Sequence, residues 1–328
     1  MIDVPLSVLE LSMTEDGRDA TAAFTATTAV ARRADELGLR RVWTAEHHGS
    51  TAIASVVPPV LIAHLAAATA RIRVGSGGVL APNHAPLAVA EQFATLAALH
   101  PDRIDLGIGR GPGTFDQNMV RALRRGAAPA TAEDYRRDIT ELLGHLSGAS
   151  GLRLLPGPVP TPLPWVLASS TGGAELAAEF GLPVAFAHHI RPENTVAAAE
   201  RYRGAFRPGR WSDTPYVIVA VETLCAPTDA AAATLARPGD VLKAYLLSGR
   251  GDTGLRTPEA AAEHEFPVEI AQRIAEFRAT QAQGSPETVR RQLNWLADKT
   301  GADELMLVTT VYDPAARLRS LELVVHGE

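Results

Sequence analysis

The sequence predicts an α/β fold made of a single (β/α)₈ TIM barrel over residues 1–328. Three observations predict it. Short apolar segments alternate with helical segments along the chain, as in parallel sheets covered by helices. Eight such apolar segments can be counted, which is the number that closes a barrel. The chain length also falls within the roughly 200 to 400 residues of this fold, so we expect one domain.

The first half of the chain alternates regularly. We expect strands at residues 6–9, 41–44, 72–79 and 104–108, and helices at 22–37, 57–68 and 87–99. Gly38 supports the end of the first helix, because glycine is favoured just past a helix C-terminus. Polar or glycine-rich clusters follow the second, third and fourth strands. The C-terminal strand ends of a barrel converge on one mouth, so these clusters predict an enzyme site there.

The second half of the chain is less regular. We expect strands at residues 165–169, 184–187, 216–225 and 304–309, and helices at 131–146, 174–180, 194–206, 285–299 and from Pro314. Ser285 and Pro286 form a typical helix start. After the seventh strand, residues 237–266 contain a polar, glycine-rich run that is too long for an ordinary connection. A mobile lid over the mouth and an inert surface loop both remain open for this segment.

Composition excludes several classes of protein. The formal net charge is -6, which offers no positive field to attract nucleic acid. The sequence shows neither a signal peptide nor an apolar run of 18 residues, so we expect a cytoplasmic protein without membrane spans. Cys225 is the only cysteine and is expected to be a buried apolar residue, which excludes an internal disulfide.

Glu46, His47 and His48 directly follow the second strand. Histidine titrates near neutral pH and serves as acid, base or hydrogen-bond donor. A metal site is the competing interpretation. Adjacent side chains on an extended strand point to opposite faces, however, so His47 and His48 do not easily bind one ion together. A functional histidine is therefore favoured, and we expect no metal.

Glycines cluster at the third and fourth strand ends. Ser76, Gly77 and Gly78 lie in an otherwise ideal strand, where glycine weakens the structure. Close approach of a flat ligand, a strained peptide bond or a simple β-bulge would each explain them. Arg110 follows the fourth strand and is interpreted as an anion-binding side chain, with a salt-bridged rim residue as the alternative. Pro112 stands where a dinucleotide-binding helix would begin, which excludes a Rossmann fingerprint.

Small polar residues follow the fifth strand. Ser169 and Ser170 precede Gly172 and Gly173 at the start of the next helix, whose exposed backbone N–H groups can bind phosphate. Ordinary capping of the helix by serine explains the same residues. His188, at the end of the sixth strand, adds a polar side chain to the same mouth, unless it is only a solvent-exposed loop residue.

Three segments together resemble the bacterial-luciferase-like flavin monooxygenases. The segments are residues 42–48, residues 74–79 with 82–86, and residues 102–110. The resemblance implies a (β/α)₈ barrel that binds reduced FMN at the C-terminal strand ends and uses O₂ to oxidise a small organic substrate. A flavin reductase or NAD(P)H would supply the reducing equivalents.

The resemblance also implies roles for particular residues. Arg110, Ser169 and Ser170, with Gly172 and Gly173, would hold the FMN phosphate. Ser76 and a cis peptide at Gly77-Gly78 would lie beside the flavin ring, and His188 replaces an aromatic residue that luciferase has near the flavin. His47 would be the catalytic histidine, with Glu46 as its neighbour.

Two departures favour a non-luminescent oxidoreductase. Luciferase has an acidic residue where this chain has Ser169, and a cysteine where it has Gly109. A deazaflavin-dependent hydride-transfer enzyme on the same barrel and a non-catalytic flavin-binding subunit are the alternatives. The family commonly dimerises through helices 57–68 and 87–99, where Ala66, Ala67, Ala94 and Ala97 would allow close packing, so we expect a homodimer. An internal contact of these helices with the loop around Pro156 is the alternative.

Overall fold

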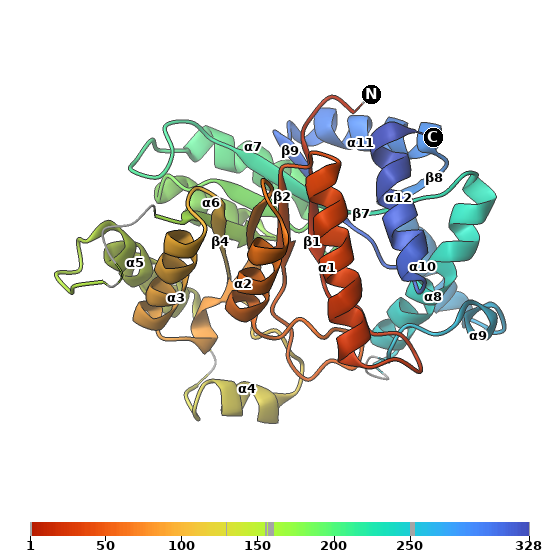
Figure 1. Ribbon diagram of the computed structural model, residues 1–328, viewed down its shortest axis with the longest axis horizontal. Helices are drawn as coiled ribbons and strands as arrows, with labels where there is room; N and C mark the ends of the chain where they lie inside the picture. The colour runs from red at the N-terminus through yellow and green to blue at the C-terminus, as the bar shows by residue number, and fades with distance from the viewer. Residues whose placement is uncertain (1, 129, 155, 157–160, 250–252, 328) are drawn as a thin grey trace.

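The computed structural model describes residues 2–128, 130–154, 156, 161–249 and 253–327. Parallel strands in the order β6-β5-β4-β3-β2-β1-β9-β7 form a barrel, which the pairing of β6 with β7 closes (Figure 1). The barrel strands are β1 Leu6–Glu10, β2 Arg41–Thr44, β3 Arg73–Leu80, β4 Ile104–Gly109, β5 Leu163–Ala168, β6 Val184–Phe186, β7 Val217–Cys225 and β9 Glu304–Val308. The predicted (β/α)₈ barrel is confirmed, and each predicted strand agrees with its barrel strand to within two residues.

Helices surround the barrel. They are α1 Ala20–Glu36, α2 Pro58–Ala68, α3 Pro86–Leu99, α4 Gln117–Leu123, α5 Ala132–Ser147, α6 Thr171–Glu179, α7 Thr195–Ala205, α8 Asp229–Leu247, α9 Pro258–Ala262, α10 Val268–Arg278, α11 Pro286–Thr300 and α12 Pro314–His326, with short 3₁₀ turns η1 Ala81–Asn83 and η2 Pro192–Asn194. In Figure 1, α1, α2 and α3 cover the front of the barrel and α4 lies below it. Ser285 caps α11 as its sequence predicts, since its side chain accepts from the Thr288 N–H.

The segment after β7 differs from its sequence-based interpretation. Residues 237–247 belong to the long helix α8, with Pro238 inside it, and do not form a polar loop. A short strand, β8 Ala282–Gly284, then pairs with the C-terminal end of β7. Leu255 is fully buried and pairs with Glu15 in the loop after β1. Residues 250–252 of the candidate lid lie outside the described residues. The insertion after strand seven is therefore largely helical and is attached to the first loop.

The barrel interior is filled by side chains from alternate strand positions. Its apolar part comprises Leu9, Trp43, Ala45, Trp165, Ala185, Ile218, Ala220, Met306 and Val308. Below these residues, at the N-terminal end, Arg41 donates to both oxygens of Glu304 at 2.8 and 2.9 Å and to Asp105 at 2.8 Å. Such a buried ion network has each charge compensated by another, so removal of one partner would be strongly destabilising.

The outer face of each strand packs against the helices. Val8, Val42, Val74 and Val166 belong to this outer core. Cys225 is buried at the end of β7, as the sequence predicts. No helix in the described part of the chain is both long and apolar enough to cross a membrane.

Candidate functional site

The C-terminal strand ends meet at one mouth, and Glu46 links three of the loops that surround it. Its carboxylate accepts hydrogen bonds from the Leu80 N–H at 3.0 Å, from Asn83 at 3.3 Å, and from Nε2 of His48 and of His84, both at 2.9 Å. A carboxylate only accepts, so each of these ring nitrogens carries its hydrogen. Asn83 also donates to the Pro112 carbonyl oxygen, which adds the loop after β4.

Glu46 is held as a carboxylate. Burial opposes its ionisation, but hydrogen bonds from His48 and His84, the charge of His84 and the Leu80 N–H outweigh burial and lower the pKa of Glu46 to about 2. The side chain is almost completely buried. Glu46 therefore positions the mouth loops, because donors of the protein already occupy both of its carboxylate oxygens.

His47 directly follows Glu46 in the loop after β2. Trp43 and Ala45 face the barrel interior, and His47 continues this alternation by position. Its backbone N–H donates to the Ser55 carbonyl oxygen at 2.9 Å, and its side chain is partly buried. His48 turns toward Glu46, and the position of the His47 side chain relative to it stays a prediction.

The glycines of β3 make room for the barrel's own side chains. A Cβ at Gly75 would lie 2.6 Å from the Asp105 Cβ and 2.8 Å from the Trp43 ring nitrogen, and one at Gly77 would lie 2.6 Å from Leu9. The pairing of β3 with β4 shifts register after Gly77, which corresponds to the bulge interpretation. Packing within the protein therefore accounts for glycine at 75 and 77.

The Gly77-Gly78 peptide bond is cis, as the resemblance implies. A Cβ at Gly78 would lie 2.5 Å from Leu167 and 2.8 Å from the Gly107 carbonyl oxygen. Ser76 lies on the opposite face of the strand, where its buried hydroxyl donates to the Gly107 carbonyl oxygen at 2.9 Å. The Ser76 side chain thus joins β3 to β4 and does not face the mouth.

Arg110 and the start of α6 carry the features of an anion site. Arg110 is exposed, and the structure shows no ion pair for it within the described residues. Ser170 caps α6 by accepting from the Gly173 N–H at 3.4 Å, and the Ser169 carbonyl oxygen accepts from Asn194 at 2.9 Å. No described residue forms a salt bridge with Arg110, so the alternative of a salt-bridged rim arginine is not supported.

The two glycines at this helix start differ. A Cβ at Gly173 would lie 2.8 Å from the Ala168 Cβ, so packing requires glycine there. A Cβ at Gly172 would meet no atom within 4 Å. The space above Gly172 is open, and the exposed helix N-terminus behind it favours a negatively charged group.

His188 is buried, and both of its ring nitrogens form hydrogen bonds. Its Nε2 lies 3.2 Å from the Thr280 carbonyl oxygen and its Nδ1 lies 3.0 Å from the Thr195 hydroxyl. The carbonyl can only accept, so Nε2 carries the hydrogen and Nδ1 accepts from Thr195. Burial lowers the pKa of His188, which favours the neutral ring. His188 thus joins the end of β6 to α7 and to the segment after α10, and the alternative of a solvent-exposed loop histidine does not hold.

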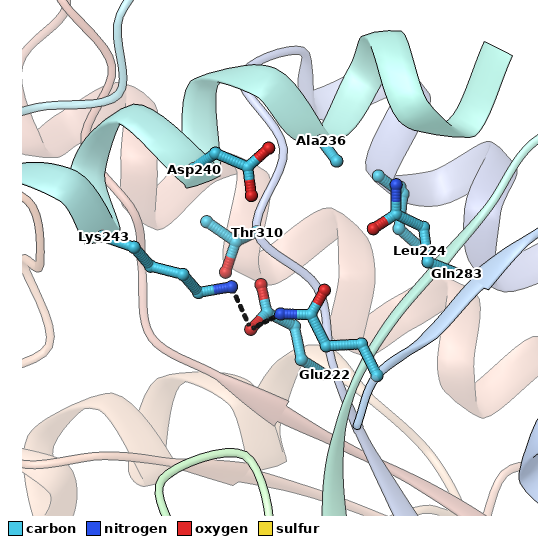
Figure 2. Close-up of a pocket in the computed structure, with 8 residues that line it drawn as sticks. Glu222, Leu224, Ala236, Asp240, Lys243, Gln283 and Thr310 are labelled. Atoms are coloured by element: carbon cyan, nitrogen blue, oxygen red, sulfur yellow. Dashed lines mark hydrogen bonds and ion pairs between the residues drawn. The ribbon is translucent and has the colours of Figure 1, made fainter. Parts of the chain in front are cut away.

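Sequence reasoning missed a polar group on the other side of the mouth. Glu222 of β7 binds Lys243 of α8 at 2.6 Å and Gln281 at 3.0 Å, as the dashed lines in Figure 2 mark. Asp240 and Thr310 line the same cavity. Its volume is about 10 Å³, which is room for about one water molecule. The available signal was one acidic residue inside the apolar strand 217–225.

Comparisons with known proteins give a consistent result. The profile of the luciferase-like monooxygenases matches residues 7–304. The luciferase-like monooxygenase of Escherichia coli (strain K12) is 36% identical, over 98% of this chain and 96% of that protein. The crystal structure of apo-MsnO8 is 39% identical and superposes with a TM-score of 0.92, over 98% of this chain and 97% of that one.

More distant structures share the fold alone. The oxygenating constituent of 3,6-diketocamphane monooxygenase from Pseudomonas putida, solved with FMN, is 20% identical, with a TM-score of 0.70 over 99% of this chain and 98% of its own. A secondary alcohol dehydrogenase that depends on the deazaflavin F420 is 11% identical, with a TM-score of 0.71 over 98% of each chain. The same barrel thus serves both kinds of cofactor.

Proposed function

This chain belongs to the luciferase-like monooxygenase family, and from that premise we propose that it uses reduced FMN and O₂ to oxidise a small organic substrate without emitting light. Membership of the family makes it an oxidoreductase. The finer assignment depends on the residues at the mouth.

One observation carries the choice of a phosphate-bearing flavin. Arg110 is exposed without a described ion-pair partner, and α6 presents its N-terminus beside the open space at Gly172. A guanidinium and a helix N-terminus are the donors that phosphate prefers in proteins. These residues fit the phosphate of FMN.

The other residues would act on the substrate and on the reacting part of the cofactor. The flavin, when bound, supplies the electrons and the reaction with O₂. His47 would hold or move a proton at the mouth, and Glu46 would keep its loop in place through His48 and His84. The apolar interior below the mouth, with Leu9 and Trp43, would help exclude water.

Two further features belong to this proposal. The insertion over residues 237–266, whose helix α8 is attached to the end of β7 by the pair of Lys243 with Glu222, would act as a lid over the mouth. A separate flavin reductase or NAD(P)H would reduce the FMN. The distant relative from Pseudomonas putida, described as an oxygenating constituent, supports the reductase by analogy.

An absorbance titration with FMN, reduced FMN and F420, followed by oxygen-uptake measurements with reduced FMN, tests this function. We expect reduced FMN to bind more tightly than F420 and to be reoxidised faster with protein than without it. Tighter binding of F420 would favour the hydride-transfer enzyme. Binding of FMN without any effect on oxygen uptake would favour a non-catalytic flavin-binding subunit.

A further inference from the structure

The small cavity between β7 and α8 is polar on most of its wall. Its volume is about 10 Å³, and six of the eight residues that line it carry polar side chains. The six are Glu222, Asp240, Lys243, Gln281, Gln283 and Thr310. Apolar cavities of proteins stay dry, whereas a polar one of about this size holds a water molecule if several of its groups need a partner. The hydrogen bonds of the lining groups therefore decide what the cavity binds.

The lining residues come from elements that are far apart in the sequence. Glu222 belongs to β7, Asp240 and Lys243 belong to α8, and Thr310 follows β9. In Figure 2 the side chains of Asp240 and Thr310 point toward the Glu222 carboxylate. A ligand in this space would therefore contact the end of the barrel and the insertion at the same time.

Two of the lining atoms lack a hydrogen-bond partner in the part of the chain that the structure describes. Oε2 of Glu222 accepts from Lys243 at 2.6 Å and from Gln281 at 3.0 Å, whereas Oε1 accepts from no described residue. The Thr310 hydroxyl also has no described partner. Both atoms keep some accessible surface, since neither is among the fully buried atoms without a partner. A carboxylate oxygen only accepts, so the ligand must donate a hydrogen to Oε1 of Glu222.

Donors face the ligand as well. The Lys243 ammonium carries three hydrogens, and Oε2 of Glu222 is its one described acceptor. The Thr310 hydroxyl can donate or accept. A ligand that only donates would leave the spare hydrogens of Lys243 unpaired. A water molecule both donates and accepts, so it can satisfy Lys243, Thr310 and Oε1 of Glu222 together.

The charges around the cavity compensate each other in pairs. Lys243 lies 2.6 Å from Glu222, and Arg278 binds the Asp240 carboxylate. A bound cation would lie beside the Lys243 ammonium, and a bound anion would lie beside two carboxylates, so neither ion is favoured. The cavity therefore fits a neutral ligand that is no larger than water.

We propose that the cavity is a binding site for one ordered water molecule, which joins the end of the barrel to α8. The water accepts from Lys243, donates to Oε1 of Glu222 and bonds the Thr310 hydroxyl. These bonds add to the direct pair of Lys243 with Glu222 and help to hold α8 against the barrel. The inference goes beyond the proposed function and depends on neither flavin nor substrate.

A high-resolution crystal structure of the full chain tests the site directly. We expect one water peak in the cavity, with Glu222, Lys243 and Thr310 within hydrogen-bond distance of about 2.6–3.2 Å. Ala236 lines the cavity from α8, and Ala236→Val would add methyl groups to this space. The crystal structure of Ala236→Val should therefore lack the water peak.

Hydrogen–deuterium exchange tests whether the water holds α8. Thr310→Val removes one partner of the water at nearly constant side-chain volume, so the amides of residues 240–247 should exchange roughly fivefold faster than in the wild type. Thr310→Ser keeps the hydroxyl and should exchange as the wild type does. Thr234→Val, at an exposed position of the same helix, is the matched control and should leave the rates unchanged.

A wild-type crystal structure without a water peak in the cavity, or with the short coordination distances of a metal ion there, would overturn the proposal. Equal exchange rates in Thr310→Val and the wild type would also overturn it, because the water would then not hold α8. If Thr310→Val fails to fold by circular dichroism, the crystal structures of the wild type and Ala236→Val decide. None of these measurements uses flavin or O₂, so their outcome is separate from that of the proposed function.

Discussion

At the scale of single residues, the mouth combines a carboxylate that positions loops with an arginine that has no described ion pair. Glu46 uses both oxygens on protein donors, whereas Arg110 keeps its guanidinium without a described ion pair. His47 lies three residues beyond the end of β2. Substitutions at Glu46 should therefore change stability, and those at His47 should change turnover.

His47→Ala is expected to lower turnover with reduced FMN by about 10²–10⁴, with a much smaller change in flavin affinity, because loss of a proton-transfer group affects the chemical step. Substrate-dependent oxygen uptake and a binding titration measure the two quantities separately. His326→Ala, at the end of α12, is the control. Unchanged turnover in His47→Ala would remove this residue from the reaction.

Glu46→Gln is expected to lower the free energy of unfolding at pH 7 by roughly 3 kcal/mol. The pKa of Glu46 in the folded protein is about 2, below its ordinary value of 4.5, so its contribution is complete above pH 4.5 and is lost as the pH falls toward 2. Urea unfolding at several pH values measures this. Between pH 4.5 and 2, the free energy of unfolding should depend less steeply on pH in Glu46→Gln than in the wild type. The exposed variant Glu91→Gln should behave as wild type. Equal slopes for Glu46→Gln and wild type would contradict the assignment.

At the scale of elements, the glycines of β3 and of the α6 start have different causes. Gly75 is enclosed by Asp105 and Trp43, whereas Gly172 faces open space. The first belongs to the packing of the barrel and the second to the surface of the mouth. A side chain added at each position should therefore have different effects on stability.

Gly75→Ala is expected to destabilise the fold by about 1–3 kcal/mol, because the added methyl group overlaps the Asp105 backbone and the Trp43 ring. Gly172→Ala should change stability by less than about 0.5 kcal/mol. Thermal and urea unfolding of both variants provide the comparison. If the two variants are equally stable, the glycines of β3 are not required by packing.

The sequence predicts the barrel well where apolar strands alternate with helices, and less well after β7. The run Arg237-Pro238-Gly239 suggests a break in the chain, yet α8 continues through it, since Gly239 packs closely against Thr310. Proline and glycine weaken a helix locally, and only tertiary contacts explain why this one continues. The three-residue strand β8 is too short for an alternation to be recognised.

For the functional site too, local sequence patterns predict some features, and contacts between distant elements determine the others. Strand-end clusters placed Glu46, His47, Arg110 and Ser170 at one mouth from the sequence. The contact of Glu46 with His84 joins residues 38 positions apart, and that of Glu222 with Lys243 joins a strand to a helix that was not predicted. Such contacts depend on the packing of elements, so local sequence patterns do not reveal them.

At the scale of the whole molecule, the structure leaves only Ala67 exposed among the four alanines that the sequence suggests for the predicted homodimer interface. Ala66, Ala94 and Ala97 are buried in the chain's own core, because their helices turn them toward the barrel. Ala67 is exposed, as is Val60 on the same helix with 69% of its surface accessible. Pro156 is exposed too, and the residues on either side of it lie outside the described part of the chain.

Light scattering is therefore expected to give about twice the 34.7 kDa of one chain at micromolar concentration. Val60→Glu should reduce the mass toward that of one chain, because a charge would be buried at the interface of α2. Val268→Glu, on α10 with the same 69% exposure, is the matched control and should remain dimeric. A wild-type mass of one chain would rule out the dimer.

The most direct test of the central claim, that Arg110 and the start of α6 hold the phosphate of FMN, compares FMN with riboflavin. Arg110→Ala is expected to weaken FMN binding by about 1.5–3 kcal/mol and to leave the affinity for riboflavin, which lacks the phosphate, nearly unchanged. Arg210→Ala, in the loop before β7, should change neither affinity. Equal losses of affinity for FMN and riboflavin in Arg110→Ala, or no loss for either, would contradict the account.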